Sequence, residues 1–476
     1  MNFSSKPPTV RLLCAAFLGF VCACAPKVPE ARWAELGLDL PERWASSQEA
    51  KAGVDHGWVA RFHSPGLESA VDRAIAQQPD LKAAAARVRR AAAQAEIDRS
   101  AVRPKLDLNT DFTRQKQRFI GFPGVGGANI FDTVGVSLDL SWELDLWGAY
   151  RSGTEGLIAL WQAEAESQKA AELSLAAQFC KAWFAAAEAQ EQLRLAEQAV
   201  EFRRTTAKSL EERLESSLDQ EGGTASQVFL ARTDAATAAA EMEGWKQELD
   251  GARRQLELLS GDFAQGKIKV PTSLPKLPAN PPAGLPSELL LRRPDIVAAE
   301  RRFAARGRAI KQAKRAVYPS FNLTGSRGTI GTDLAEALDS TNGVWRLAGG
   351  LAQPILTGGR ITGEIEARTA DEEEALAQLQ KSVLQGFYEV ELALSIEKFL
   401  KRRIAALETA GDASDQAAEQ ANEEFSRGTA NILVLLEAET RRLALRSQLI
   451  KLRRLRLDNR VNLHLALGGD FRVRNK

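Results

Sequence analysis

The sequence has few of the residues that enzymes use at active sites, and its charges nearly cancel. Its three histidines lie far apart, with neither the spacing of metal ligands nor a nucleophile as a partner: His56, His63 and His464. Lysine plus arginine (63) almost balances aspartate plus glutamate (62), so electrostatics do not favour a nucleic-acid partner. We therefore expect no enzymatic activity, no metal, no cofactor and no nucleic-acid partner.

One glycine-rich stretch and two charged clusters do not change this expectation. Residues 121–129 lie between expected strands rather than before a helix, so they do not form a phosphate-binding loop. The acidic residues 371–374 and the basic residues of 451–460 lie on expected helices, where a solvated face is the ordinary interpretation. A contact of the basic run with anionic groups is a weaker alternative.

Long apolar runs and cysteines are also scarce. No run of about twenty apolar residues is present, so we expect no helix of the mature chain to span a membrane, and a membrane protein with this sequence would need strands. Only four cysteines occur. If the N-terminal segment is removed before Cys24, only Cys24 and Cys180 remain, and we expect no disulfide.

The N-terminus has the features of a bacterial lipoprotein signal. Lys6 and Arg11 precede an apolar region at 12–21, and small residues lead to Cys24. We predict a signal peptide at 1–23 and lipid attachment, through acyl chains such as palmitate, at Cys24. The resemblance to lipoprotein signals implies that Ala25, after the lipidated cysteine, directs transport onward to the outer membrane. An ordinary secretory signal is the alternative.

Landmarks in the first half of the chain recur in the second half. Four pairs keep their order, with offsets between 205 and 215: Pro79-Asp80 and Pro294-Asp295, Arg103-Pro104 and Tyr318-Pro319, Gly223-Thr224-Ala225 and Gly428-Thr429-Ala430, Gly261-Asp262-Phe263 and Gly469-Asp470-Phe471. We interpret the chain as a duplication of one unit of roughly two hundred residues, since repeats share landmarks at a fixed period.

Each repeat is expected to contain a helix, a β-hairpin and a long helical hairpin. In the first repeat, 67–263, the helix breaks near Pro79, the β-hairpin lies near 105–142 and the helical hairpin near 148–260. The second repeat, 287–471, has a helix at 287–317, a β-hairpin near 320–356 and a helical hairpin near 360–467. Gly328, Gly331 and Gly343 are assigned to the loop of the second β-hairpin.

Three further segments complete the expected organisation. An extended arm occupies 24–66, a proline-rich connector 264–286 and a short tail 472–476.

The element lengths constrain the architecture. Two shorter helices laid end to end match one helix of close to seventy residues, and the last helix has apolar residues on more than one flank, as the wall of a tube requires. Four alternating strands cannot close a barrel, so strands in a membrane would require several copies of the chain. A soluble sheet and an ordinary antiparallel bundle remain alternatives.

Several motifs resemble the TolC/OprM-type outer-membrane factors (NodT-like efflux lipoproteins) of tripartite efflux systems. They are found at 142–148, 289–300, 316–320, 323–325 and 354–360. The resemblance implies a mixed, mostly α fold: a trimer whose 12-stranded outer-membrane barrel continues into a periplasmic 12-helix tunnel of roughly 100 Å. It also implies a passive exit duct for drugs or other small molecules. Its partners would be a periplasmic adaptor (membrane fusion protein) and an inner-membrane pump of the RND type.

The resemblance also assigns candidate site residues. The tip turns that would dock the adaptor contain Gly222, Gly223, Thr224, Arg427, Gly428 and Thr429. The periplasmic gate would lie beside them, at Phe229, Val434 and Glu437. Because only Glu437 is acidic, an apolar constriction is possible in place of an acidic ring. Alternatively, Phe229 and Val434 point into the wall and Glu437 is an ordinary solvated charge.

A soluble periplasmic coiled-coil adaptor or scaffold is the second candidate function. It would explain the helices but not the two alternating hairpins. Neither the exported compound nor the partner pump can be identified from these residues.

Overall fold

The computed structural model describes residues 27–46, 57–118, 128–216, 224–282, 284 and 286–472. The chain divides into two compact units, each assembled from three segments. Unit 1 comprises residues 1–37, 87–165 and 298–380 and contains the sheet, whereas unit 2 comprises 38–86, 166–297 and 381–476. Within the described ranges, no helix has both the length and the apolar character required to cross a membrane.

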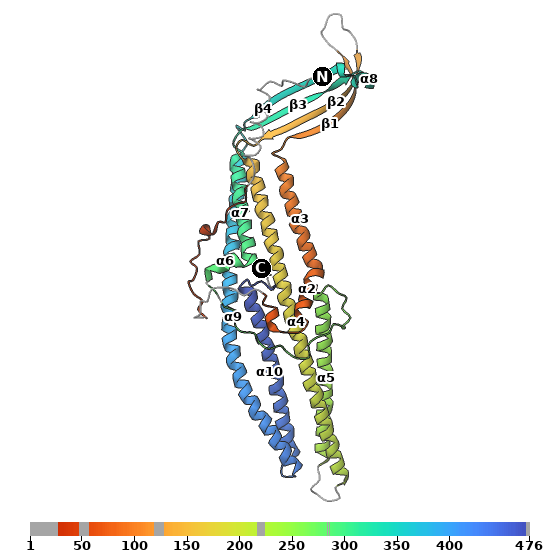
Figure 1. The fold of residues 1–476 in the computed structure, drawn as a ribbon, viewed down its shortest axis with the longest axis vertical. Helices are drawn as coiled ribbons and strands as arrows, with labels where there is room; N and C mark the ends of the chain where they lie inside the picture. Colours follow the sequence, from red (N-terminus) through yellow and green to blue (C-terminus); the bar gives the residue numbers. More distant parts are fainter. Residues whose placement is uncertain are drawn as a thin grey trace, which may run out of the picture. The chain divides into compact units, whose positions relative to one another are not determined.

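The same order of main elements occurs twice (Figure 1). The first set is α2 (Leu67–Gln77), α3 (Pro79–Ser100), β1 (Lys105–Arg118), β2 (Ala128–Leu144), α4 (Ala149–Ser216) and α5 (Ala225–Leu259). The second set is η3 (Pro286–Glu288), α6 (Leu289–Arg292), α7 (Pro294–Arg315), β3 (Ser320–Gly331), α8 (Leu334–Ala337), η4 (Ser340–Asn342), β4 (Gly343–Ala352), α9 (Arg360–Ser426) and α10 (Ile432–Ala466). The arm contains η1 (Trp33–Glu35) and η2 (Ala60–Phe62), so it is not extended throughout.

Both sets have a helix break at the Pro-Asp landmark. Gln78 and Arg293, the residues before the prolines, have ψ angles of 122° and 116°, as expected because a following proline disfavours the helical region. The range 287–317, expected as one helix, is therefore divided between α6 and α7. The break is the same in both halves.

Each break lies against the end of the last helix of its own set. Gly261 follows α5 and Gly468 follows α10, with φ angles of 78° and 71°. A Cβ on Gly261 would lie 3.2 Å from the carbonyl oxygen of Gln77, and one on Gly468 would lie 2.9 Å from that of Arg292. Glycine suits both positions because it tolerates positive φ and allows this close approach.

The strands extend beyond the alternating apolar residues. β1 continues through polar residues to Arg118, and β2 begins at Ala128, inside the stretch assigned to a loop. Gly328 and Gly331 lie within β3 and Gly343 is the first residue of β4, so the assignment of these three glycines to the loop was wrong. A Cβ on Gly328 would lie 2.1 Å from the carbonyl oxygen of Val136, so close contact between strands explains this glycine.

Two short helical elements between β3 and β4 were not predicted. Asp333 caps α8 by accepting a hydrogen bond from the backbone N–H of Glu336 (2.9 Å), and the Glu336 carboxylate accepts one from the N–H of Thr332 (2.8 Å). This reciprocal pattern is a capping arrangement, and the Thr-Asp-x-x-Glu spacing was the available sequence signal.

The largest apolar cluster of unit 2 includes the end of the N-terminal arm. Trp58 and Phe62 are fully buried together with Phe179 and Phe184 of α4. The Trp58 indole donates to the carbonyl oxygen of Gly469 (3.2 Å) and stacks on His464 at 5.5 Å. Burial, followed by the nearby positive charges, lowers the pKa of His464 to about 3, so this core histidine is neutral at physiological pH.

The long helices of unit 2 form two antiparallel hairpins that contact each other. α4 pairs with α5 through Arg232 and Glu211 (2.6 Å), and α9 pairs with α10 through Arg453 and Glu408 (3.1 Å). α4 contacts α10, since the side-chain amide of Gln192 donates to the carbonyl oxygen of Ser447 (2.9 Å). The helix order is therefore α5, α4, α10, α9, and α10 has a packed neighbour on each flank, as its apolar pattern predicted.

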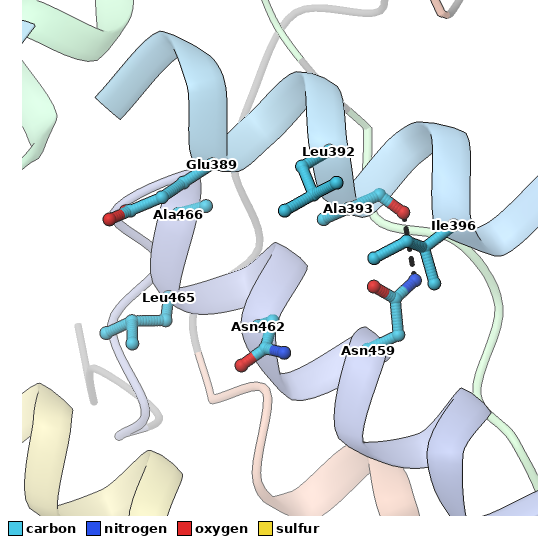
Figure 2. Close-up of a pocket in the computed structure, with 8 residues that line it drawn as sticks. All are labelled: Glu389, Leu392, Ala393, Ile396, Asn459, Asn462, Leu465 and Ala466. Atoms are coloured by element: carbon cyan, nitrogen blue, oxygen red, sulfur yellow. Dashed lines mark hydrogen bonds between the residues drawn. The ribbon is translucent and has the colours of Figure 1, made fainter. Parts of the chain in front are cut away.

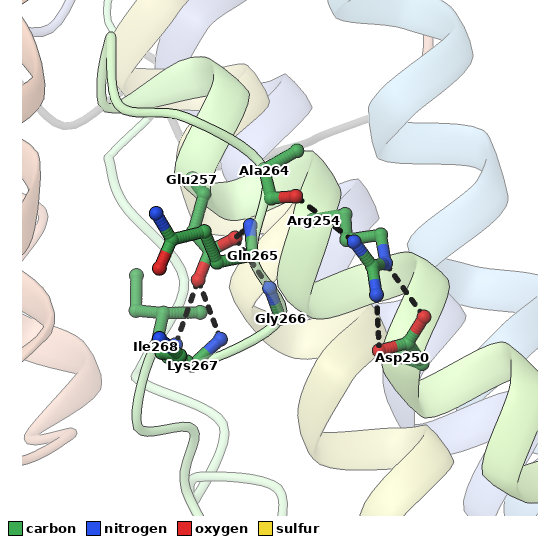
Figure 3. Close-up of polar contacts among 8 residues, drawn as sticks. All are labelled: Asp250, Arg254, Glu257, Ala264, Gln265, Gly266, Lys267 and Ile268. Atoms are coloured by element: carbon green, nitrogen blue, oxygen red, sulfur yellow. Dashed lines mark hydrogen bonds and ion pairs between the residues drawn. The ribbon is translucent and has the colours of Figure 1, made fainter.

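The start of the connector is held by side chains of α5 through hydrogen bonds (Figure 3). The Glu257 carboxylate accepts four backbone N–H groups, from Gln265, Gly266, Lys267 and Ile268, at 2.5–3.0 Å. Desolvation opposes ionisation of Glu257, but the four donors outweigh it and hold the pKa of this carboxyl below its usual value of 4.5. Nearby, Arg254 bridges Asp250 and the carbonyl oxygen of Ala264.

Candidate functional site

The sheet of unit 1 has one apolar face. Its four antiparallel strands follow the order β1-β2-β3-β4, and the register places apolar side chains opposite one another, as at Leu106 and Leu140 or Leu108 and Leu138. The other large apolar members of this face are Phe112, Ile130, Val134, Val136, Trp142, Leu144, Phe321, Leu323, Trp345, Leu347 and Leu351. The face also contains the charged residues Arg114, Lys116, Arg118, Asp132 and Arg327. Leu106, Leu108, Phe112, Trp345, Leu347 and Leu351 are all exposed. An apolar face of this extent requires an apolar neighbour.

The opposite face of the same sheet is mainly polar. Asp107 lies opposite Asp139, which accepts hydrogen bonds from the Asn109 amide (2.6 Å) and the Ser137 hydroxyl (2.9 Å). Ser141, Asn322, Thr324, Ser326 and Arg346 lie on this face as well. A sheet with one apolar and one polar face suits a boundary between lipid and water.

Both edges of the sheet are open in the described chain. β1 pairs with β2 alone and β4 with β3 alone, and every residue of β1 is exposed. An edge strand presents unpaired backbone donors and acceptors, which are costly to place in hydrocarbon. In lipid, these edges would require partner strands.

Tryptophans occur where the strands meet other elements. The indole of Trp142 donates to the carbonyl oxygen of Val102 (2.9 Å), and that of Trp147 donates to Pro319 (2.8 Å). Trp147 also stacks on Tyr318 at 4.9 Å, and both rings are exposed. Aromatic side chains at strand ends are typical of a membrane interface, with the polar part hydrogen-bonded.

Four of the six predicted tip residues lie at helix ends of the two hairpins. Thr224 precedes α5, and its N–H donates to the Gln227 side chain (3.0 Å). Gly428 has a φ of 80° after α9, and Thr429 donates its N–H to the carbonyl oxygen of Glu424 (2.9 Å). Arg427 pairs with Glu423 on the preceding turn (3.1 Å). Gly222 and Gly223 lie outside the described residues.

The three candidate gate residues lie just inside these tips, but they do not belong to the core there. That core joins all four helices through Ala207 and Leu210 of α4, Val228 and Ala231 of α5, Ala421 of α9, and Ile432 and Leu435 of α10. Phe229 and Val434 adjoin core residues but are exposed, and Glu437 forms an exposed ion pair with Arg441 (2.7 Å). The side chains of Phe229 and Val434 are therefore exposed enough to contact another apolar surface.

Cys24 lies outside the described residues, and burial raises the pKa of the fully buried Cys180 thiol. Among the described side chains, no group of three or more His, Cys, Asp or Glu residues could hold a metal ion.

A cleft of about 250 Å³ between α9 and α10 is lined mostly by apolar groups (Figure 2). The Asn459 amide donates to the carbonyl oxygen of Ala393 (2.9 Å), and Glu389 pairs with Arg293 (2.7 Å). The amide therefore connects α10 to α9, and the ion pair connects α9 to the residue between α6 and α7.

Comparisons with known proteins agree with this geometry. The sequence matches the family described as "Outer membrane efflux protein" over residues 70–262 and 285–469. It is 29% identical to the probable efflux pump outer membrane protein SepC of Pseudomonas putida, with 87% of this chain and 85% of the relative covered. It is 28% identical to the pyoverdine export outer membrane protein OpmQ of Pseudomonas putida, with 97% and 98% covered.

Solved channel structures share the fold. The outer-membrane channel OprN is similar with a TM-score of 0.84 and 25% identity, and the match covers 94% of this chain and 99% of that one. The open-state MtrE outer membrane channel of Neisseria gonorrhoeae has a TM-score of 0.81 and 26% identity, covering 94% and 100%.

Proposed function

Because the chain belongs to the outer membrane efflux protein family, we propose that three copies of it form a passive exit duct in the outer membrane. The chain is an outer-membrane channel component of an efflux pump. The trimer would combine four strands from each copy into one 12-stranded barrel and the helical hairpins into a periplasmic tunnel. In this interpretation, the duplication supplies two wall segments per chain.

The two-faced, open-edged sheet is the observation that carries the proposal. Its apolar face would contact lipid, its polar face would line a water-filled lumen, and neighbouring copies would pair with β1 and β4. A soluble adaptor has no use for such a sheet. Acyl chains on Cys24 would add a second attachment to the outer membrane.

The duct would receive its cargo from other proteins. The exposed turns around Thr224 and Gly428 would dock a periplasmic adaptor, which links the duct to an inner-membrane pump, proposed to be of the RND type. The pump supplies the energy. The cargo is a drug or another small molecule, as with the pyoverdine in the name of one relative.

Membrane fractionation tests this function. We expect the protein to remain with outer membranes after a high-salt wash and to behave as a trimer in mild detergent, because its apolar sheet face would be held by lipid rather than by charge. Recovery as a soluble monomer would instead favour the periplasmic scaffold.

The gate at the tip would be apolar. Phe229 and Val434 occupy equivalent positions, each five residues beyond the threonine of its tip turn, and both are exposed. In a trimer, six such side chains could form a ring that closes the tunnel by excluding water. The double variant Phe229→Ala, Val434→Ala should therefore raise closed-state conductance several-fold in planar bilayers.

Leu230→Ala with Leu433→Ala is the matched control. These exposed leucines adjoin the gate residues but point about 100° away around each helix. Unchanged closed-state conductance in the gate variant, or an equal rise in the control, would contradict the apolar gate.

A further inference from the structure

The last part of β1 has positive charge on one face of the sheet only. Three cations alternate there with two neutral residues: Arg114, Gln115, Lys116, Gln117 and Arg118. Because successive side chains of a strand point to opposite faces, the three cations share the apolar face with Leu108 and Phe112. The two glutamines lie on the polar face. Water would solvate charge equally well on either face, so this separation indicates that the two faces have different surroundings.

The cation cluster, defined as Arg114, Lys116 and Arg118, is accessible. Every residue of β1 is exposed. Arg114 lies 3.6 Å from the Asp132 carboxylate of β2, but 63% of its side chain stays exposed, and an ion pair at such a position is weak. Among the described residues, Lys116 and Arg118 have no ionic partner. Three cations against one carboxylate leave a net charge of +2 that a ligand could neutralise.

The register places the cation cluster at the rim of the apolar face. Arg114 is opposite Asp132, and Asp132 lies ten residues along β2 from Trp142, where the strand approaches the helices. Ten residues correspond to about 34 Å of strand. With the tilt of about 40° found in transmembrane barrels, the cluster would begin roughly 26 Å above Trp142, which matches an apolar band about 25 Å tall. Arg327, the remaining cation of this face, lies lower, opposite Leu138, and is not part of the cluster.

A short helix adds exposed apolar side chains to the same rim. Gly331 of β3 lies opposite Val134, on the apolar face, and a Cβ on this glycine would clash with the Cβ of Glu336. α8 therefore packs over this face, at the end of the sheet remote from the helices (Figure 1). Leu334 and Leu338 of α8 are 62% and 70% exposed. The rim thus combines cations with apolar side chains, the two features that bind an anionic amphiphile.

The carboxylates of the α8 segment are engaged within that segment. Asp333 accepts a hydrogen bond from the N–H of Glu336 (2.9 Å), and Glu336 accepts from the N–H and the hydroxyl of Thr332 (2.8 Å each). Asp339 accepts from the N–H of Thr341 (2.9 Å). These groups cap turns beside β3, which is separated from β1 by β2, so the charge of the cation cluster stays in place.

We propose that the cation cluster binds the phosphate groups of a phosphorylated lipid in the outer leaflet of the outer membrane. The proposal rests on the proposed barrel, which turns the apolar face toward lipid and the end of β1 away from the periplasm. Arginine and lysine suit phosphate oxygens, since charge-assisted hydrogen bonds are the strong ones. The ligand is a lipid rather than a free phosphate, because the apolar face continues directly below the cations and the leucines of α8 lie at the same rim.

Binding of lipid A, a glycolipid with two phosphate groups, tests the site. The purified trimer in mild detergent should bind lipid A, measured by native mass spectrometry, and binding should fall by about tenfold or more when the phosphates of the lipid are removed. Arg114→Gln with Arg118→Gln should abolish this preference. Excess inorganic phosphate should compete weakly, because it lacks the acyl chains that contact the apolar face.

A variant with the same composition is the matched control. Exchanging two neighbouring pairs, by Arg114→Gln, Gln115→Arg, Gln117→Arg and Arg118→Gln, moves two arginines to the polar face and leaves the net charge unchanged. This variant should also lose the preference for phosphorylated lipid A. Both variants should remain trimeric, since the substitutions alter side chains at the exposed end of β1 and not the backbone pairing.

The outcomes separate this site from the duct itself. A trimer that binds lipid A equally well with and without its phosphates would overturn the site and leave the proposed function standing. So would an exchange variant that keeps the preference, or full competition by inorganic phosphate. A protein that forms no trimer in any preparation would overturn the proposed duct.

Discussion

Replacing Leu108 by arginine should prevent assembly of the protein in the outer membrane. Leu108 is exposed on the apolar face of β1, directly opposite Leu138. An arginine facing the middle of a bilayer costs about 2–4 kcal/mol, and a trimer would contain three. We expect loss of the outer-membrane trimer, measured by fractionation and by native electrophoresis in mild detergent.

Asn109→Arg is the matched control, one residue further along the same strand. Asn109 lies on the polar face, where its amide contacts Asp139 and where Asp107 and Asp139 would accept a positive charge. Because successive side chains of a strand point to opposite faces, this variant should assemble normally. Equal loss in both variants, or normal assembly of Leu108→Arg, would show that the apolar face does not contact lipid.

Glu397→Ala should destabilise unit 2 by about 3–5 kcal/mol, because removing one partner of a buried ion pair leaves the other charge without compensation. The Glu397 carboxylate on α9 accepts hydrogen bonds from Arg456 (2.8 Å) and Arg460 (3.1 Å) of α10. Arg460 is almost completely buried and also donates to the Pro278 carbonyl oxygen and the Asn280 side chain. The loss should therefore loosen both the helical hairpin and the connector.

The exposed pair between the same two helices provides the control. Glu408 of α9 pairs with Arg453 of α10, and both side chains are about half exposed. Glu408→Ala should change the free energy of unfolding by about 0–1 kcal/mol. Thermal and denaturant unfolding of both variants, followed by circular dichroism, would measure the difference. A Glu397 variant as stable as the Glu408 variant would contradict a structural role for the buried pair.

The strands show which structural features an alternating side-chain pattern predicts and which it does not. Alternation around Leu106 and Leu108 identified β1 and its apolar face, because side chains on a strand have a period of two. It did not identify the end of the strand at Arg118, since backbone pairing with β2 continues after the apolar residues stop. The break at Arg293 was predictable from Pro294, as at Pro79, because a proline disfavours the helical region for the residue before it. It was not predicted because the residues on both sides have a helix-forming composition.

The order of the elements, the faces of the strands and the family were all predictable from the sequence, because they depend on local periodicity and on motifs within short stretches. Which positions are covered depends on how distant segments pack, so it is known only from the folded chain. Ala177 and Tyr388 occupy the same place in their repeats, yet one is buried and the other exposed. The difference arises because α10 of the same chain packs against α4 and helps to cover Ala177, whereas no helix of the described residues covers Tyr388.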